Sequence, residues 1–236
     1  MVLSSNLSTP RLISLRASGG VISLWVGMAI EPQVKRAIVF IDGQNLFFGA
    51  KSAFGYRWPN YAVDRLAAAV CAQQGWQCAG VRFYTGVPEP GDNTFWNQFW
   101  NAKLAAMGTR GVKIFRRGLR YRNQTVKLPG GGSHTFLVAQ EKGIDIRIAL
   151  DIVHAVRAKL CDVALVFSQD QDLSEVADEV RFISTDQGRW FKIASAFPSS
   201  PTSHNTRGIN KTDWIRVDRA LYDTCIDPVD YRPRRP

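Results

Sequence analysis

The chain lacks any apolar run long enough to cross a membrane, and it has few of the residues that build zinc sites or disulfide frameworks. None of its hydrophobic stretches reaches the roughly 18 residues that a spanning helix requires. It contains four cysteines and three histidines. Cys71 and Cys78 are too far apart for a C-x-x-C pair, and no histidine lies near them at zinc spacing. These absences argue against a membrane protein and a zinc centre, and they favour free thiols in a cytoplasmic protein.

Acidic residues are scarce relative to basic ones. The 236 residues include 20 Asp and Glu against 30 Lys and Arg, which gives a formal net charge of +10. A basic balance favours polyanionic partners, because Lys and Arg replace the counterions around phosphates. Residues 1–27 contribute only Arg11 and Arg16, so the remainder still carries +10 − 2 = +8. The basic character therefore belongs to the body of the chain and favours a nucleic-acid partner.

The first 27 residues differ from the rest of the sequence. They contain no acidic residue and only a short apolar run at residues 21–26. A targeting segment is one interpretation, but the run is short and no small-residue cleavage site follows it. We prefer the alternative that Met28 is the natural start and that residues 1–27 are a disordered or non-native extension. Residues 28–236 are then expected to form a single domain with a basic C-terminal tail.

Apolar runs alternate with helical periodicities along this domain. Uninterrupted apolar runs predict buried strands at residues 37–41 and 163–167, and further strands are expected at residues 80–86, 112–115 and 191–197. Apolar residues at steps of three and four predict helices over residues 61–74, 92–107, 143–160 and 173–183, and a further helix is expected from Asn45. Between residues 116 and 139 we expect a basic strand pair joined by a glycine-rich loop. Alternating strands and helices predict an α/β layered fold with a mainly parallel sheet.

Carboxylates follow two of the predicted strands. Asp42 comes directly after the first buried run, and Asp170 follows another after two polar residues. The carboxyl ends of parallel strands meet at one edge of a sheet, where Glu141, Asp145 and Asp172 could join them from neighbouring loops and helix starts. Converging carboxylates repel one another unless a cation neutralises them, and oxygen-only ligands favour Mg²⁺ or Mn²⁺. A single aspartate after a strand is more often a turn former, but the repetition of the pattern favours a metal site.

Capping and ion pairing within a helix can also account for several of these polar residues. Asp172 fits a helix N-cap, since a glutamate follows three residues later, and Asn45 also fits a helix cap. Asp151 lies four residues after Arg147, so an ion pair on one helix face accounts for it. His154, on the same helix, is treated as structural.

Three short segments together resemble a known family. They are residues 41–46 (Ile-Asp-Gly-Gln-Asn-Leu), 141–145 (Glu-Lys-Gly-Ile-Asp) and 168–172 (Ser-Gln-Asp-Gln-Asp). Their order and context resemble the D-G-x-N, E-K-G-x-D and S-x-D-x-D pattern of the NYN domain, in its bacterial LabA-like branch. One such segment is weak evidence, whereas three in order are specific. The resemblance covers roughly residues 35–197.

The resemblance implies a three-layer, PIN-like (Rossmann-like) α/β fold, with a mainly parallel sheet flanked by helices, and metal-dependent ribonuclease activity. It implies that Mg²⁺ or Mn²⁺ is held by Asp42, Asp145 and Asp170. Asp172 would be a further ligand, directly or through water. Asn45 would orient a ligand or the scissile phosphate.

The sequence departs from the family pattern at two positions. Gln169 stands where many relatives have Gly, and Leu173 where many have Phe. A glycine permits backbone conformations that glutamine tolerates poorly, so the departure concerns the loop geometry more than the chemistry. Asp151 occupies a position that is commonly acidic in the family. It lies six residues after Asp145, however, and therefore on a different face of the helix, so it ranks lower as a metal ligand.

Two basic segments are candidates for holding the substrate. The first contains Arg116, Arg117, Arg120, Tyr121 and Arg122. Basic groups can track phosphates while an aromatic ring stacks on an unpaired base, but a charged edge strand protected from pairing is an equal alternative. In the second, residues 203–212, Arg207 and Lys211 could grip phosphate, although a surface connector accounts for this loop as well. The aromatic helix is expected to form core or a dimer surface.

We therefore expect a cytoplasmic, metal-dependent endoribonuclease that acts on RNA, with a homodimer as one assembly to consider. Two alternatives stay open. The first is a catalytically silent, RNA-binding regulatory module that kept the fold. The second is a DNA-directed nuclease of the same fold, because recognition of RNA depends on contacts to the 2′-hydroxyl that the sequence does not reveal.

Overall fold

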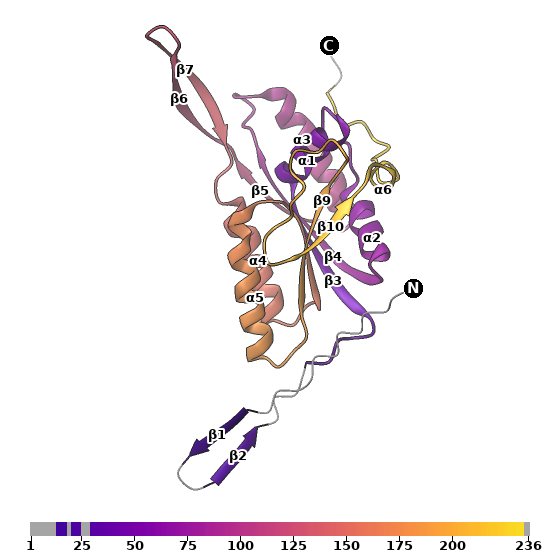
Figure 1. Cartoon of the computed structure of the whole chain (residues 1–236). Helices are drawn as coiled ribbons and strands as arrows, with labels where there is room; N and C mark the ends of the chain where they lie inside the picture. The colour runs from indigo at the N-terminus through magenta and orange to yellow at the C-terminus, as the bar shows by residue number, and fades with distance from the viewer. Residues whose placement is uncertain (1–12, 18–19, 25–28, 234–236) are drawn as a thin grey trace.

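A six-stranded sheet forms the centre of the protein. The computed structural model describes residues 13–17, 20–24 and 29–233 (Figure 1). The sheet has the strand order β10-β9-β8-β3-β4-β5, and all its neighbouring strands are parallel. Its strands are β3 (Lys35–Asp42), β4 (Trp76–Val87), β5 (Lys113–Gly118), β8 (Val163–Phe167), β9 (Lys192–Pro198) and β10 (Asp213–Val217). The expected parallel sheet is confirmed.

Helices cover both faces of this sheet. They are α1 (Gly43–Phe54), α2 (Val63–Gln73), α3 (Thr94–Thr109), α4 (Ile144–Arg157), α5 (Ser174–Asp186) and α6 (Arg219–Asp223). Residues of α1, α2, α3 and α6 pack against one face, and residues of α4 and α5 pack against the other. The result is the three-layer α/β arrangement predicted from the sequence (Figure 1).

Strand β3 shows why the sequence forms these layers. Its side chains alternate between the two cores: Val39 and Ile41 belong to one, and Ile38 and Phe40 to the other. A strand covered on both faces must be apolar throughout, and this explains the unbroken run before Asp42.

Two antiparallel ribbons stand outside the central sheet. Strands β6 (Arg120–Leu128) and β7 (Gly132–Gln140) form a hairpin, here called the arm, which projects from the body beyond β5 (Figure 1). It confirms the predicted basic strand pair. Strands β1 (Ile13–Ala17) and β2 (Gly20–Leu24) form the other hairpin. The remainder of the expected extension at residues 1–27 lies outside the described residues, and whether this segment is native stays a prediction.

The chain after residue 198 adds to the fold. It was expected as a basic tail, but it contributes β10 to the edge of the sheet and α6 to one of its faces. Strand β10 is short and its exposure alternates, so its sequence lacks the apolar run that marks the central strands. In the described part of the chain, no helix is both long and apolar enough to span a bilayer.

Candidate metal centre

The two aspartates predicted at the sheet edge lie at neighbouring strand ends. Asp42 is the last residue of β3, and Asp170 follows shortly after β8, which pairs with β3 in parallel with Ile41 opposite Phe167. Each side chain accepts a backbone hydrogen bond at the start of the next helical turn. Asp42 Oδ1 accepts from the N–H of Asn45 at 2.9 Å, and Asp170 Oδ1 accepts from the N–H of Asp172 at 3.0 Å. Capping therefore fixes both carboxylates at the carboxyl edge of the sheet.

Gly43 allows helix α1 to begin immediately after Asp42. A Cβ atom at this position would lie 2.5 Å from Cζ of Phe83 and 2.9 Å from the carbonyl oxygen of Tyr84, both on β4. Only glycine fits this close approach, which explains why Asp42 is followed by glycine.

Helix α4 brings a third aspartate to the same edge. Gly143 caps α4 in the left-handed conformation with φ of 74°, and Asp145 lies in the first turn. The carboxylates of Asp145, Asp170 and Asp172 each offer an oxygen atom, and these atoms all lie within 4.8 Å of one another. Oxygen donors at this spacing fit a hard divalent cation.

Asp42, Asp145 and Asp170 line a pocket of about 510 Å³. Its polar lining includes Asp42, Asn45, Glu141, Asp145, Asp170, Gln169, Ser203 and Asn205. This set is called the carboxylate pocket below. Asp172, on the short helical turn η1 (Gln171–Leu173), belongs to the cluster but is more exposed than Asp145 and Asp170.

Burial and mutual repulsion make this pocket electrostatically costly without a cation. Burial raises the pKa of Asp42 to about 6, with the charges of Asp170 and Asp145 contributing. Burial likewise raises the pKa of Glu141 to about 7, with Asp42 and Asp145 contributing. Within the described part of the chain, Glu141 Oε1 is buried without a hydrogen-bond partner. A bound cation would relieve all three penalties, so the residues present fit a divalent metal.

Asn45 and Gln169 hold the pocket in shape. Asn45 Oδ1 accepts a hydrogen bond from the backbone N–H of Gln169 at 3.0 Å. The Gln169 amide donates to the carbonyl oxygens of Arg207 at 2.8 Å and Asn205 at 3.2 Å, so it fastens the loop that follows β9. Among the described residues, the non-glycine residues with positive φ are Lys159 and Lys211, so Gln169 does not occupy a conformation that demands glycine.

Asp151 lies in a different environment from the other aspartates. It accepts a hydrogen bond from the Tyr84 hydroxyl at 2.8 Å and pairs with Arg147 at 3.1 Å, which confirms the predicted ion pair. His154 and Asp151 line a separate hollow on the α4 side of the sheet. Leu173, the other departure from the family pattern, is buried in the core. Neither Asp151 nor His154 is among the residues that line the carboxylate pocket.

The predicted substrate-binding residues are distributed around the pocket rather than gathered in it. Arg116 donates to Asn101 Oδ1 at 2.8 Å, and Arg117 donates to the carbonyl oxygen of Lys142 at 3.2 Å. Arg120 and Arg122 are exposed on the arm. A role in substrate binding stays a prediction for all four.

The loop after β9 places its two basic residues differently. Arg207 is exposed, and its carbonyl oxygen accepts a hydrogen bond from Gln169, which lines the pocket; Arg207 itself is not among the lining residues. Lys211 instead forms an ion pair with Asp178 on α5 and is not among the residues that line the carboxylate pocket.

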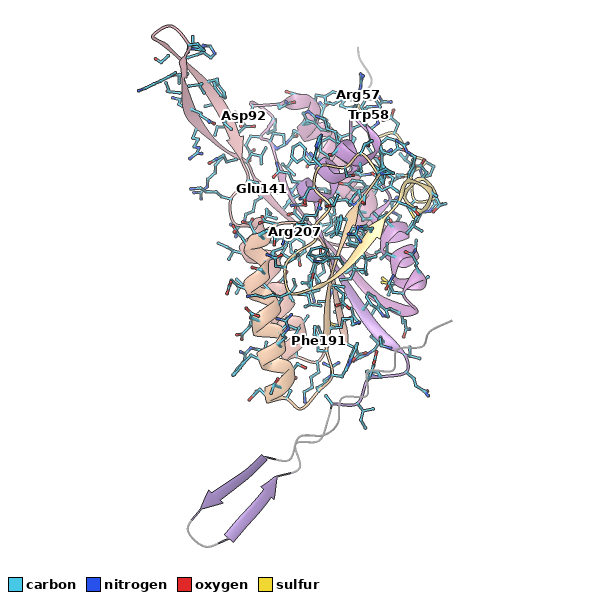
Figure 2. The ribbon with its side chains drawn as sticks, viewed as in Figure 1. Arg57, Trp58, Asp92, Glu141, Phe191 and Arg207 are labelled. Carbon is cyan, nitrogen blue, oxygen red and sulfur yellow. The ribbon has the colours of Figure 1, made fainter. Side chains whose placement is uncertain are left out.

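A second hollow of about 330 Å³ adjoins the carboxylate pocket and shares Gln44, Phe48 and Glu141 with it. Tyr121, from the base of the arm, lines this hollow. Figure 2 shows Glu141 where the arm leads into α4, and Asp92 beside the arm. No sequence pattern indicated the hollow, because its walls come from segments far apart in the chain.

Comparison with known proteins places the chain in a family. The NYN domain family model matches residues 36–185, which is more than half of the chain and includes Asp42, Asp145 and Asp170. No curated protein matches it. Among solved structures, a protein of unknown function from Vibrio parahaemolyticus is 15% identical, with 80% of this chain and 98% of that chain covered and a TM-score of 0.47. MurG of Acinetobacter baumannii is 10% identical (77% and 45% covered, TM-score 0.30). A nucleoside kinase from Burkholderia thailandensis, solved with inosine, is 11% identical (69% and 52% covered, TM-score 0.27).

Proposed function

This chain belongs to the NYN domain family of PIN-like nucleases, and from this premise we propose that it is a metal-dependent endoribonuclease of the LabA-like branch, acting in the cytoplasm. The observation that carries the proposal is the cluster of Asp145, Asp170 and Asp172 oxygens within 4.8 Å of one another. A family fold alone does not establish activity, but a cluster of oxygen donors on the segments that resemble the family pattern supports it.

Mg²⁺ or Mn²⁺ is the proposed ion, held by Asp42, Asp145 and Asp170, with Asp172 as a further ligand. The chemistry that such an ion supplies when bound is neutralisation of phosphate charge and a lowered pKa of water. Asn45 keeps Asp170 in place by holding the backbone of Gln169. Hydrolysis by in-line attack of water breaks the bond between phosphorus and the 3′-oxygen, so 5′-phosphate and 3′-hydroxyl ends are expected.

RNA is the proposed substrate, and the arm supports it. Arg120 and Arg122 are exposed on a ribbon that leads directly to the pocket through Glu141, and Tyr121 lies between them. Exposed basic groups can follow phosphates along a single strand while the scissile phosphate lies at the carboxylates. A homodimer remains a prediction of the sequence.

The proposal is tested by incubating the full chain with labelled single-stranded RNA or matched DNA, in Mn²⁺, Mg²⁺ or EDTA. We expect RNA cleavage that EDTA abolishes. The Asp170→Asn variant is expected to lose at least about 100-fold in rate, because removing a ligand should cost more than the 10–100-fold typical of residues that only support a ligand. Asp186→Asn, the same change at an exposed position of α5, should cleave normally.

Two further outcomes would redirect the proposal. Cleavage of DNA alone would keep the metal site and change the substrate. Salt-dependent RNA binding without cleavage in either metal would identify a binding module instead of a nuclease.

A further inference from the structure

The second hollow has walls of aromatic rings. Phe47 and Phe48 come from α1, Trp96 and Trp100 from the first half of α3, and Tyr121 from the first residues of the arm. Phe48 is 52% exposed, although a large apolar side chain gains free energy when it is buried. The hollow therefore presents aromatic surface to solvent immediately beside the carboxylates.

Tyr121 closes one side of this hollow. It is half-buried, whereas its neighbours Arg120 and Arg122 on β6 are exposed. Burial, together with the carboxylates of Asp92 and Glu89, raises the pKa of its hydroxyl. Tyr121 at the base of the arm and Asp92, just before α3, line the same hollow, so both segments border it.

We propose that this hollow receives one unstacked base of single-stranded RNA, next to the phosphate at the carboxylate pocket. This inference rests on the proposed function for the nature of the substrate. Gln44, Phe48 and Glu141 line both cavities, so a base in the hollow and its phosphate at the aspartates belong to adjoining sites. Aromatic side chains provide stacking surfaces for any unpaired base.

The polar groups of the hollow suit a base and not a phosphate. Asp92 and Glu141 line it, and their carboxylates would repel a phosphate but accept hydrogen bonds from base N–H groups. The Gln44 amide can both donate and accept, as the edge of a base requires. The basic side chains Arg120 and Arg122 lie outside the hollow, where the backbone of the strand would run.

The test compares intact RNA with RNAs that each lack one base at successive positions. Binding is measured by fluorescence anisotropy in Mn²⁺ with the full chain carrying Asp170→Asn, alone and combined with Tyr121→Ala, Tyr121→Trp or Arg122→Ala. Cleavage of the same RNAs by the unsubstituted chain gives the position of the cut.

We expect loss of one base, at a fixed position from the cut bond, to weaken binding about tenfold, as removal of a stacked base typically does. Tyr121→Ala should weaken binding of intact RNA by a similar factor and have no further effect on the RNA that lacks this base. Tyr121→Trp should retain binding because it keeps an aromatic face. Arg122→Ala should weaken both RNAs equally.

Two results would overturn the proposal: equal effects of base loss at every position, or equal effects of Tyr121→Ala on intact and base-deficient RNA. The coupling between Tyr121 and the base, which is the difference between the effects of Tyr121→Ala on intact and base-deficient RNA, is measured by binding. It therefore does not depend on whether the chain cleaves RNA. A chain that shows the coupling but cleaves nothing would retain the base site and refute the nuclease.

Discussion

Asn45 Oδ1 accepts a hydrogen bond from the backbone N–H of Gln169 at 3.0 Å, while the N–H of Asn45 donates to Asp42. One side chain thus joins the first turn of α1 to the loop that carries Asp170. The sequence suggested Asn45 as a helix cap or as a group that orients ligand or phosphate. In the structure, its hydrogen bonds link the end of β3 to the loop that follows β8.

We predict that Asn45→Ala lowers cleavage by roughly 10–100-fold, the usual effect of removing a partner that orients metal ligands. The loss should decrease as the Mn²⁺ concentration rises. The metal ligands remain in this variant, but they are less well oriented, so the affinity for the ion is lowered and a higher concentration compensates. Cleavage rates across a metal titration measure this. Asn60→Ala is the control, since it removes a hydrogen bond from the Tyr222 hydroxyl to an asparagine that does not line the pocket. If both variants shift the metal dependence equally, Asn45 has no special role.

The Gln169 side chain leads to a second prediction. Because it fastens the carbonyl oxygens of Arg207 and Asn205, Gln169→Ala should destabilise the protein by about 1 kcal/mol. Gln169→Gly, which restores the residue common in relatives, should destabilise it further, since the position does not require left-handed backbone and glycine is costlier to order. Urea denaturation of the three proteins measures both effects. A Gln169→Gly variant more stable than the parent would show that the loop is strained at this position.

The sequence predicted the parts of the site that depend on local patterns. Asp42 and Asp170 follow strands whose apolar residues are dictated by burial on both faces, so their position at one sheet edge could be inferred from the order of the residues alone. The role of Gln169 could not, because it depends on a loop 36 and 38 residues away in the chain. Tyr121 was expected to meet substrate from the arm, but the hollow that it lines requires α1 and α3 to be placed first. Strand β10 was missed because a half-exposed edge strand has a weak pattern.

Substitutions of two aspartates on helix α4 should have different effects, one on the cleavage rate and the other on the free energy of unfolding. Asp145 lies at the carboxylate cluster, whereas Asp151 binds Tyr84 and Arg147 away from it. We predict that Asp145→Asn abolishes cleavage with little change in stability. Asp151→Asn should keep cleavage within about threefold and cost roughly 1–3 kcal/mol, because it weakens a half-buried hydrogen bond and an ion pair. Cleavage assays and urea denaturation of both variants decide the matter. Equal loss of cleavage would place Asp151 in the catalytic machinery.

The raised pKa values in the carboxylate pocket predict how stability depends on pH. Asp42 has its pKa raised to about 6 and Glu141 to about 7, so the folded state holds these protons more tightly than the unfolded state. Their stabilising contribution is complete below pH of about 3, where both groups are protonated even in the unfolded chain, and it is lost as pH rises through about 6–7.

In EDTA, we therefore expect the free energy of unfolding to fall between pH of about 4.5 and about 7.5, with Asp42 accounting for about 2–3 kcal/mol. Asp42→Asn should reduce this dependence by the share that Asp42 contributes, because an amide does not ionise, and should leave the share of Glu141. Adding Mn²⁺ at pH of about 7.5 should restore stability to the parent protein, by about 2.7 kcal/mol at roughly a hundredfold excess over Kd. Urea denaturation across this pH range, with and without Mn²⁺, provides the measurement. Stability that is flat with pH in EDTA and unchanged by Mn²⁺ would show that these carboxylates do not repel one another and do not bind metal. Because the unfolded chain offers no converged carboxylates, the pH slope and the metal effect should both become smaller in Asp42→Asn, with the remaining slope coming from Glu141, and this joint reduction would tie both to one site.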